Sequence, residues 1–406
     1  MRAFNERPLR ILAADDSAVM RGIMRTLFLR HGGFGRADLP RMELVGVARD
    51  GVECLEAADS LSPDAIILDL EMPRMSGLEV LDNLRKKRSR LPVIMCSSHT
   101  ERGARATLDA LARGASDYVM KPTGQRDFEA ALASLAQQLL PRIAALASNR
   151  NRQPSSLQGT RSARTIEQNA SSTGDSAASV DVVVIGVSTG GPAALEQLLP
   201  QLPADFPVPV LVVQHMPKLF TGVLAERLNR CCRLKVAEAF HGASLRPGMI
   251  WLAPGDAHME IMSQPLSQPG SSEVVRGTAI KLHWQEPLNH CRPSVDYLFL
   301  SAVRHYAAGT LAIVLTGMGS DGLDGARAIH ACGGAVLAQD EATSAVWGMP
   351  GRIAESGIAA GVLPLPAIAR EVNQRIASRP APRHRLSMRT ATTSMPAGQE
   401  STHGML

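Results

Sequence analysis

Short apolar runs alternate with amphipathic stretches twice along this chain, and this alternation limits the possible folds more than any other property of the sequence. In the first 140 residues, an amphipathic stretch follows each apolar run. Parallel strands joined by crossover helices produce such a pattern, so the front of the chain is predicted to form βαβ units on one sheet. The expected strands are residues 11–14, 44–48, 65–68, 92–96 and 118–120.

A second series of apolar runs begins at Val182 and predicts another sheet. Helical stretches, among them residues 193–199 and 325–331, separate several of these runs. With 406 residues and 45% hydrophobic content, the chain is long and apolar enough to fill two cores. We therefore predict an α/β protein with two doubly wound parallel-sheet domains. The expected strands of the second domain are residues 182–187, 208–213, 249–252, 311–315 and 335–338.

Polar segments mark the expected boundaries of these domains. We predict a first domain over residues 9–139 and a second over residues 180–377. Residues 140–179, and above all 148–179, are rich in Ser, Arg, Asn and Gln and predict a flexible linker. The Arg/Pro/Ser/Thr-rich tail at 378–406 is expected to be disordered, and the polar insert at 263–277 is expected to be a surface loop.

The charge and cysteine patterns exclude several classes of protein. The formal net charge is +5, but nine arginines in the linker region and the tail exceed it, so the rest of the chain is not basic. Diffuse arginine without a reading motif disfavours nucleic-acid binding. Six scattered cysteines without a CxxC pair predict reduced thiols in a cytoplasmic protein. No signal peptide and no apolar run of about 18 residues is visible, so no membrane insertion is expected.

Acidic residues follow two predicted strands of the first domain. Asp15 and Asp16 come directly after residues 11–14, and Asp69 comes directly after residues 65–68. Because the carboxyl ends of parallel strands gather at one crevice, these carboxylates are expected to converge in a site suited to Mg²⁺. Asp69 can then attack a phosphodonor and form an acyl phosphate. Taken singly, an Asp pair after a strand also fits a helix N-cap.

Two further polar residues extend this acidic site. Lys121 follows the last predicted strand and can place a point charge on phosphoryl oxygens, while Ser97 offers a hydroxyl at the end of residues 92–96. The segments DDSAVMR, ILDLEMPRMSGLEVL, MCSSH and GASDYVMKP resemble response-regulator receiver domains over residues 9–139. The resemblance implies phosphorylation of Asp69, Mg²⁺ on Asp15, Asp16 and Asp69, a phosphate partner in Lys121, and a switch pair in Ser97 and Tyr118. The segment 31–41 departs from that family as a predicted loop extension.

A serine motif opens the second domain. Gly186, Ser188 and Gly190 satisfy G-x-S-x-G directly after a buried-type run, the turn that presents a serine between strand and helix. A serine hydroxyl needs a neighbouring base, and His215 follows the run 208–213. Asp321 follows the run 311–315 and can orient that base. All three therefore lie beyond the carboxyl ends of strands, where an open sheet forms its site.

Each part of this serine constellation has another interpretation. Glycine-rich strand–helix turns also bind phosphate, a histidine after a strand is commonly structural, and an aspartate beside glycines fits an ordinary turn. The stretch after Gly186 has neither the P-loop ending nor the G-x-G-x-x-G pattern, which disfavours nucleotide binding. The order Ser–His–Asp disfavours a standard α/β-hydrolase fold. His258 and His283 have no spacing typical of zinc ligands, so a metallohydrolase is disfavoured.

The segments GVSTGGP, QHMP, WLAPGDAHM, LTGMGSDGLDGA and WGMPG resemble the catalytic domain of chemotaxis protein-glutamate methylesterases over about residues 180–376. The resemblance implies a Rossmann-like serine esterase that needs no cofactor for its reaction. Its implied residues are the nucleophile Ser188, the base His215, the orienting Asp321, and oxyanion stabilisation by the backbone at Thr189 and Met318.

The two resemblances together imply a phosphorylation-controlled enzyme. It would hydrolyse γ-methyl glutamate esters on chemoreceptors through a glutamyl-enzyme, and would deamidate receptor glutamines. A chemotaxis histidine kinase would be the phosphodonor, and the protein is expected to be monomeric. Two rivals remain: a non-catalytic regulator, which intact catalytic residues disfavour, and a transcription factor, for which no helix-turn-helix is visible.

Control is expected to act through contact between the domains, since a flexible polar linker transmits no force. We predict that the unphosphorylated receiver packs over the crevice that holds Ser188, His215 and Asp321. Phosphate on Asp69 would draw Ser97 inward, let Tyr118 turn, and favour an undocked form.

Overall fold

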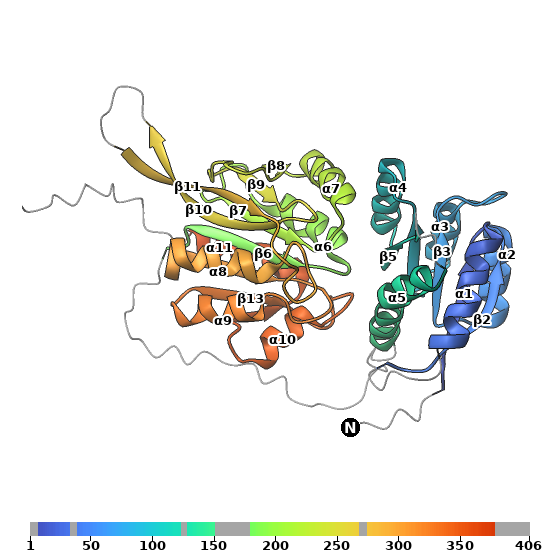
Figure 1. Ribbon diagram of the computed structural model, residues 1–406. Coiled ribbons are helices and arrows are strands. Elements are labelled where there is room, and N and C mark those ends of the chain that lie inside the picture. The colour runs from blue at the N-terminus through green and yellow to red at the C-terminus, as the bar shows by residue number, and fades with distance from the viewer. Residues whose placement is uncertain (1–6, 33–38, 123–127, 151–178, 268–273, 378–406) are drawn as a thin grey trace, which may run out of the picture.

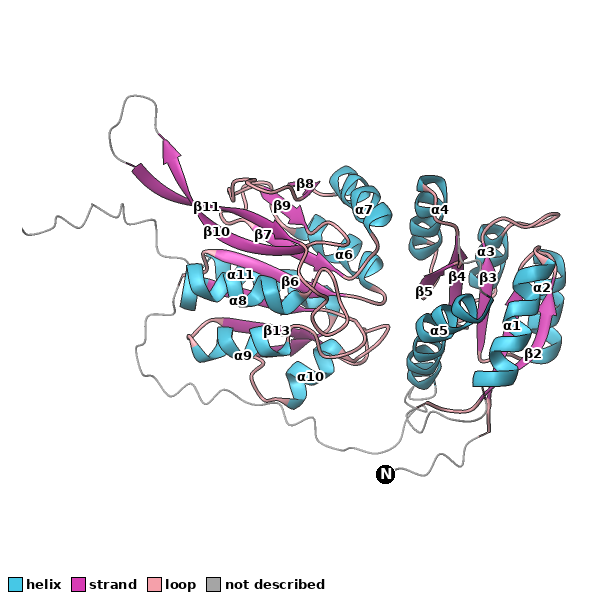
Figure 2. Cartoon of the chain, in the orientation of Figure 1, coloured by secondary structure: helices cyan, strands magenta, loops and turns pink. Residues whose placement is uncertain are grey.

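The computed structural model describes residues 7–32, 39–122, 128–150, 179–267 and 274–377. They form two α/β domains, each built on a parallel sheet with helices on both faces (Figures 1 and 2). This confirms the predicted fold class. The predicted tail and most of the predicted linker lie outside the described residues.

The first sheet has the strand order β2-β1-β3-β4-β5, with every pair parallel. Successive side chains of a strand point to opposite faces, so Ile11 packs in one core cluster and Leu12 in the other. Its strands are β1 (Leu9–Ala14), β2 (Met42–Ala48), β3 (Ala65–Asp69), β4 (Val93–Ser97) and β5 (Asp117–Met120). Its helices are α1 (Ala18–His31), α2 (Gly51–Leu61), α3 (Gly77–Lys86), α4 (Glu101–Ala112) and α5 (Phe128–Arg150).

Helix α5 extends well past the predicted domain end at residue 139. Its inward stripe continues through Leu140, Ile143 and Leu146, which are all buried, so packing carries the helix on into the sequence predicted as linker. By length and composition alone, residues 128–147 would be long and apolar enough to cross a membrane. More than half of that window is buried within the protein, as expected for a core helix.

The second sheet has seven strands in the order β14-β13-β12-β6-β7-β9-β8, again all parallel. The central strand β6 is fully buried, with β7 on one side and β12 on the other. Its strands are β6 (Val182–Val187), β7 (Val210–Gln214), β8 (Lys235–Glu238), β9 (Met249–Leu252), β12 (Thr310–Val314), β13 (Ala335–Gln339) and β14 (Gly361–Leu363). Its helices are α6 (Gly191–Leu198), α7 (Lys218–Cys231), α8 (Val295–Tyr306), α9 (Leu323–Ala331), α10 (Met349–Glu355) and α11 (Leu365–Ala377).

The polar insert predicted as a surface loop is largely a β-hairpin. Strands β10 (His258–Ser267) and β11 (Val274–His283) pair antiparallel along their whole length and project from the domain (Figure 1). Residues 268–273 between them lie outside the described residues. The prediction missed the strands because the two segments satisfy each other's backbone hydrogen bonds, which lets polar sequence form strands.

The two domains touch along α4 and β5 of the first and α6 and α7 of the second. The ring of Tyr118 stacks on that of Phe220, with centroids 4.7 Å apart and planes 17° from parallel. Ion pairs join Arg105 to Glu226 at 3.1 Å and Arg227 to Asp109. A continuous apolar cluster runs across this boundary, so the arrangement is a packed interface.

Candidate functional sites

The acidic pocket lies at the carboxyl ends of β1 and β3, as predicted. Oxygen atoms of Asp15, Asp16 and Asp69 all lie within 4.8 Å of one another. Lys121 Nζ is 3.0 Å from Asp15 Oδ2 and 2.8 Å from Asp69 Oδ2. Burial and the charge of Asp15 raise the pKa of Asp69 to about 6, even though Lys121 opposes the shift. Apart from this Lys121 contact, the buried Asp15 Oδ2 has no hydrogen-bond donor among the described residues, so this hard-oxygen site fits a divalent cation.

The two predicted switch residues lie on neighbouring strands but face different partners. Ser97 is fully buried, and its hydroxyl accepts a hydrogen bond of 2.8 Å from Thr107. Tyr118 is also buried, with its ring against Phe220 of the second domain. Tyr118 therefore touches the second domain directly. Ser97 lies at the end of β4, where its carbonyl accepts from Lys121 N at 2.8 Å, and its neighbours Cys96 and Ser98 line the acidic pocket.

Ser188 lies on a tight turn between β6 and α6. Its backbone N–H donates to Thr316 O at 3.0 Å, and its carbonyl accepts from Gly191 N at 2.8 Å and from the Gln214 amide at 2.9 Å. Gly190 has φ +78°, and a Cβ there would lie 2.6 Å from that of Ala345. Only glycine fits this position without strain, so Gly190 permits the turn that presents the half-buried Ser188.

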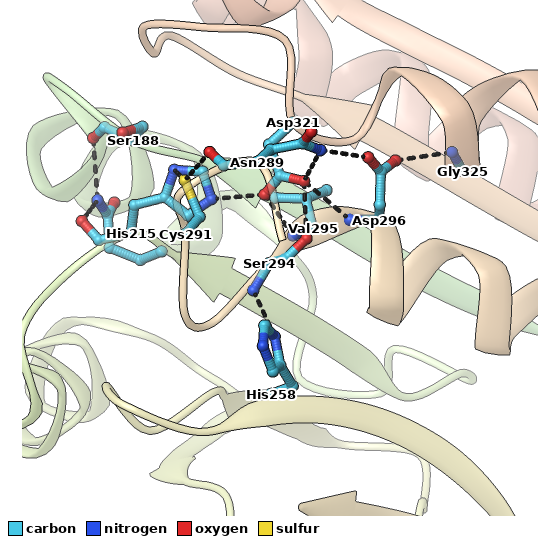
Figure 3. Close-up of polar contacts among 11 residues, drawn as sticks. Ser188, His215, His258, Asn289, Cys291, Ser294, Val295, Asp296, Asp321 and Gly325 are labelled. Carbon is cyan, nitrogen blue, oxygen red and sulfur yellow. Dashed lines mark hydrogen bonds and ion pairs between the residues drawn. The ribbon is translucent and has the colours of Figure 1, made fainter. Parts of the chain in front are cut away.

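The predicted base and carboxylate meet beside this turn (Figure 3). His215 Nε2 lies 2.8 Å from Asp321 Oδ2. Asp321 is buried, and it also accepts hydrogen bonds from Ser294 Oγ at 2.7 Å and Val295 N at 2.7 Å. Burial opposes the charge of Asp321, but His215 and these donors outweigh it and lower its pKa to about 2. Asp321 therefore stays ionised and fixes the imidazole ring.

Cys291, which the sequence analysis missed, contacts the other nitrogen of this histidine. Its Sγ lies 3.6 Å from His215 Nδ1 (Figure 3). In the described part of the chain, Ser188 Oγ makes no hydrogen bond to His215. Burial disfavours a charge on His215, but the hydrogen bonds to Asp321 and Cys291 raise its pKa above the usual 6.5. No spacing signal joins Cys291 to His215, because they lie 76 residues apart.

The backbone at the two predicted oxyanion positions is free to donate. Among the described residues, neither Thr189 N nor Met318 N donates a hydrogen bond. The rest of Thr189 is held firmly: its carbonyl accepts from Thr316 Oγ1 at 2.9 Å, and its own hydroxyl donates to Asp117 Oδ2 at 3.0 Å. Both N–H groups can therefore serve an oxyanion that forms near Ser188.

The first domain lines the mouth of this site. A cleft of about 750 Å³ has Ser188 and His215 on one side and Tyr118 and Arg142 on the other. Asp117 closes the contact, because its Oδ2 accepts both the Thr189 hydroxyl and, at 3.0 Å, Arg142 Nε. A receiver carboxylate is thus bonded to the residue next to the candidate nucleophile, and the predicted packing over the crevice is present in this structure.

The fold and these two sites define a response regulator whose output domain is an α/β hydrolytic domain. The sequence matches the family described as "Response regulator receiver domain" over residues 11–133 and that described as "CheB methylesterase" over residues 183–372. The chain belongs to the protein-glutamate methylesterase/protein-glutamine glutaminase family.

Relatives of that name match almost from end to end. The protein from Trichodesmium erythraeum is 42% identical over 90% of this chain and 99% of its own length. That from Nocardioides sp. is 44% identical over 91% of this chain and 96% of its own. Among solved structures, the methylesterase catalytic domain of Thermotoga maritima CheB is 40% identical, and the match covers 48% of this chain and 99% of that one, with a TM-score of 0.44.

Proposed function

We propose that this protein removes methyl groups from glutamate γ-methyl esters of chemoreceptors, and deamidates receptor glutamines, with Ser188 as the nucleophile. The contact that carries the proposal is the bond between His215 Nε2 and Asp321 beside the glycine-held turn of Ser188. Because Asp321 occupies Nε2, the nitrogen left to take a proton is Nδ1. This supports Nδ1 as the atom that acts as the general base.

The reaction follows from these positions. Ser188 Oγ attacks the γ-carbonyl carbon while His215 Nδ1 takes the hydroxyl proton, and the N–H groups of Thr189 and Met318 stabilise the oxyanion. The tetrahedral intermediate collapses to a glutamyl ester on Ser188 as His215 returns the proton to the leaving methanol. Water then adds with the same base, and glutamate leaves. A glutamine substrate follows the same path, with ammonia in place of methanol.

The receiver domain controls this reaction in our proposal. Asp69 accepts a phosphoryl group from a histidine kinase, and Lys121 pairs with the phosphoryl oxygens. Asp15, Asp16 and Asp69 would hold Mg²⁺. The cation would neutralise charge on the phosphodonor. The pocket supports this assignment, because two carboxylates crowd one lysine and the pKa of Asp69 is raised by burial.

Phosphorylation would open the cleft by weakening the domain contact. Tyr118 stacks on Phe220, and its neighbour Asp117 bonds Thr189, so a movement of β5 reaches the catalytic turn without passing through the linker. We place the protein in the cytoplasm as a monomer, where it would meet the kinase and the cytoplasmic parts of receptors.

Cys291 provides the sharpest test of the serine assignment, because a thiol on His215 Nδ1 is the rival nucleophile. We expect Ser188→Ala to abolish methanol release from receptor bearing isotopically labelled methyl esters, while Cys291→Ala retains it. Both variants should accept phosphate from acetyl phosphate at the parental level, which confirms a folded receiver. Loss of activity in Cys291→Ala together with activity in Ser188→Ala would reverse the assignment.

A further inference from the structure

A tight turn brings Cys291 to the catalytic histidine. Leu288 and Cys291 exchange backbone hydrogen bonds of 3.2 and 2.9 Å. The two residues between them, Asn289 and His290, have φ of +53° and +61°. Positive φ at both central residues is typical of a type I′ turn, in which asparagine is favoured at the first position. The turn therefore has a defined shape although it lies on an exposed loop.

The side chain of Asn289 turns inward from this loop and joins two carboxylates (Figure 3). Its Nδ2 lies 2.9 Å from Asp296 Oδ2 and 3.2 Å from Asp321 Oδ1. An amide nitrogen has two hydrogens, so it can donate one to each carboxylate. Asp296 is otherwise held by Gly325 N, which donates to its Oδ1 at 2.7 Å. The amide is thus a bridge between the carboxylate of the catalytic pair and a second one behind it.

The two carboxylates need such a bridge. Asp296 and Asp321 are 2% and 3% exposed, and in the described parts of the chain no lysine or arginine pairs with either. Burial, with the charges of Asp321 and Asp324, raises the pKa of Asp296 to about 6. Asp321 Oδ1 also accepts from Ser294 Oγ at 2.7 Å and from Asp296 N at 3.3 Å, but the Asn289 amide donates to both carboxylates. Without this shared donor, two buried acids side by side repel each other more strongly, and Asp321 Oδ1 loses one of its hydrogen bonds. The titratable groups that face this cluster are His215, His258, Cys291, Asp296, Asp321 and Asp324.

We propose that Asn289 is a positioning residue of the esterase site: its amide ties Asp321 to Asp296 and so fixes His215, while its turn sets Cys291 on the other side of the same ring. The inference rests on the proposed function of Ser188, His215 and Asp321. It adds a residue that no motif singled out and that touches neither the nucleophile nor the base. The Asn289 amide acts on the base through Asp321, and the Asn289 carbonyl accepts from Cys291 Sγ at 3.4 Å.

Two substitutions separate the amide from the turn. Asn289→Gly keeps the left-handed conformation without strain and removes the donor. Asn289→Asp keeps the shape but replaces the donor with a third carboxylate. His290→Gly is the matched control. It adds the same backbone flexibility at the other central position of the turn and leaves the Asn289 amide between Asp296 and Asp321 intact. Each is made in the full-length protein, activated with acetyl phosphate and Mg²⁺.

The assay measures kcat and KM for methanol release over a pH series. We expect Asn289→Gly to lower kcat by roughly tenfold with little change in KM, since two buried charged acceptors lose the donor that they share. Asn289→Asp should lose more, and the acid limb of its pH profile should move to higher pH, because added negative charge stabilises the protonated form of His215. His290→Gly should keep parental kcat and profile.

Two results would overturn the inference. One is a parental kcat and pH profile in both Asn289 variants. The other is an equal loss in His290→Gly, which would assign the effect to turn flexibility. Ser188→Ala, run alongside, separates this failure from failure of the proposed function: the Asn289 inference alone is wrong if Ser188→Ala is inactive while the Asn289 variants match the parent.

Discussion

Removing the side chain of Asp117 should raise the resting activity of the enzyme. Asp117 belongs to the receiver, yet its Oδ2 accepts the hydroxyl of Thr189 at 3.0 Å, next to Ser188. The bond from Arg142 to the same oxygen lies within the receiver and does not cross the interface, so of these two bonds to Asp117 Oδ2 the Thr189 bond is the one that opposes opening. Both Asp117 and Thr189 are buried in the closed form.

The size of the effect follows from that single bond. A hydrogen bond to a charged group contributes about 1.5–3 kcal/mol, and about 1.4 kcal/mol changes an equilibrium tenfold. Asp117→Ala should therefore raise the ratio of open to closed protein by roughly tenfold to a hundredfold. The rate of the fully phosphorylated parent sets the ceiling. The assay is methanol release from labelled receptor without a phosphodonor.

Asp109→Ala is the matched control at the same interface. Its partner Arg227 is also held by Glu196 within the catalytic domain, and Asp109 is half exposed. An exposed pair contributes about 0.2–1 kcal/mol, so resting activity should rise at most about fivefold. Parental resting activity in Asp117→Ala, in protein that acetyl phosphate still labels and activates, would refute a closing role for the Thr189 bond.

Three further predictions concern individual residues. Asp69→Asn should abolish labelling by acetyl phosphate. The pKa of Asp69 in the folded protein is raised from 3.8 to about 6, so its ionisation costs folding stability as pH rises through that window. Without Mg²⁺ at pH 7.5, the variant should therefore be more stable than the parent by up to about 3 kcal/mol in urea unfolding, and Mg²⁺ should stabilise only the parent appreciably. Equal Mg²⁺ effects on both proteins would contradict the cation site. The raised pKa of His215 predicts that kcat/KM falls on the acid side with a midpoint above 6.5. Cys291→Ala should move that midpoint to lower pH, since the thiol contributes to the raised pKa of His215. A midpoint that does not move, or that moves to higher pH, would count against the contact between Cys291 and His215. Gly190→Ala, at φ +78° with Ala345 in the way, should cost at least about 1–2 kcal/mol in urea unfolding and most of the activity, whereas a neutral result would mean that the turn is not constrained as described.

The sequence predicts the residues that follow strands better than it predicts those that meet across the fold. Asp69, Ser188 and Asp321 come directly after apolar runs, and parallel strands bring their carboxyl ends together whatever the intervening chain does. The strand ends themselves shift by one or two residues, as with β7, which runs over Val210–Gln214 against the expected 208–213.

The remaining features depend on contacts without a local signal. Asp117 and Thr189 are 72 residues apart, and nothing in either segment indicates that a receiver carboxylate bonds the catalytic turn. Asn289 lies in a polar loop, where its amide has no periodic neighbours to mark it. The hairpin β10–β11 was missed for the same reason: its partners are each other, and cross-strand pairing outweighs the polar composition of the segment.

In our proposal the receiver, docked through Asp117 and Tyr118, holds the Ser188 site closed until Asp69 is phosphorylated. The most direct measurement is methanol release by the full-length protein from labelled receptor, before and after acetyl phosphate with Mg²⁺, beside Asp69→Asn. We predict low release at rest, a rise of at least tenfold on phosphorylation, in keeping with the loss of the Asp117 bond, and no rise in Asp69→Asn. Release that is unchanged by acetyl phosphate, or that rises equally in Asp69→Asn, would contradict the account.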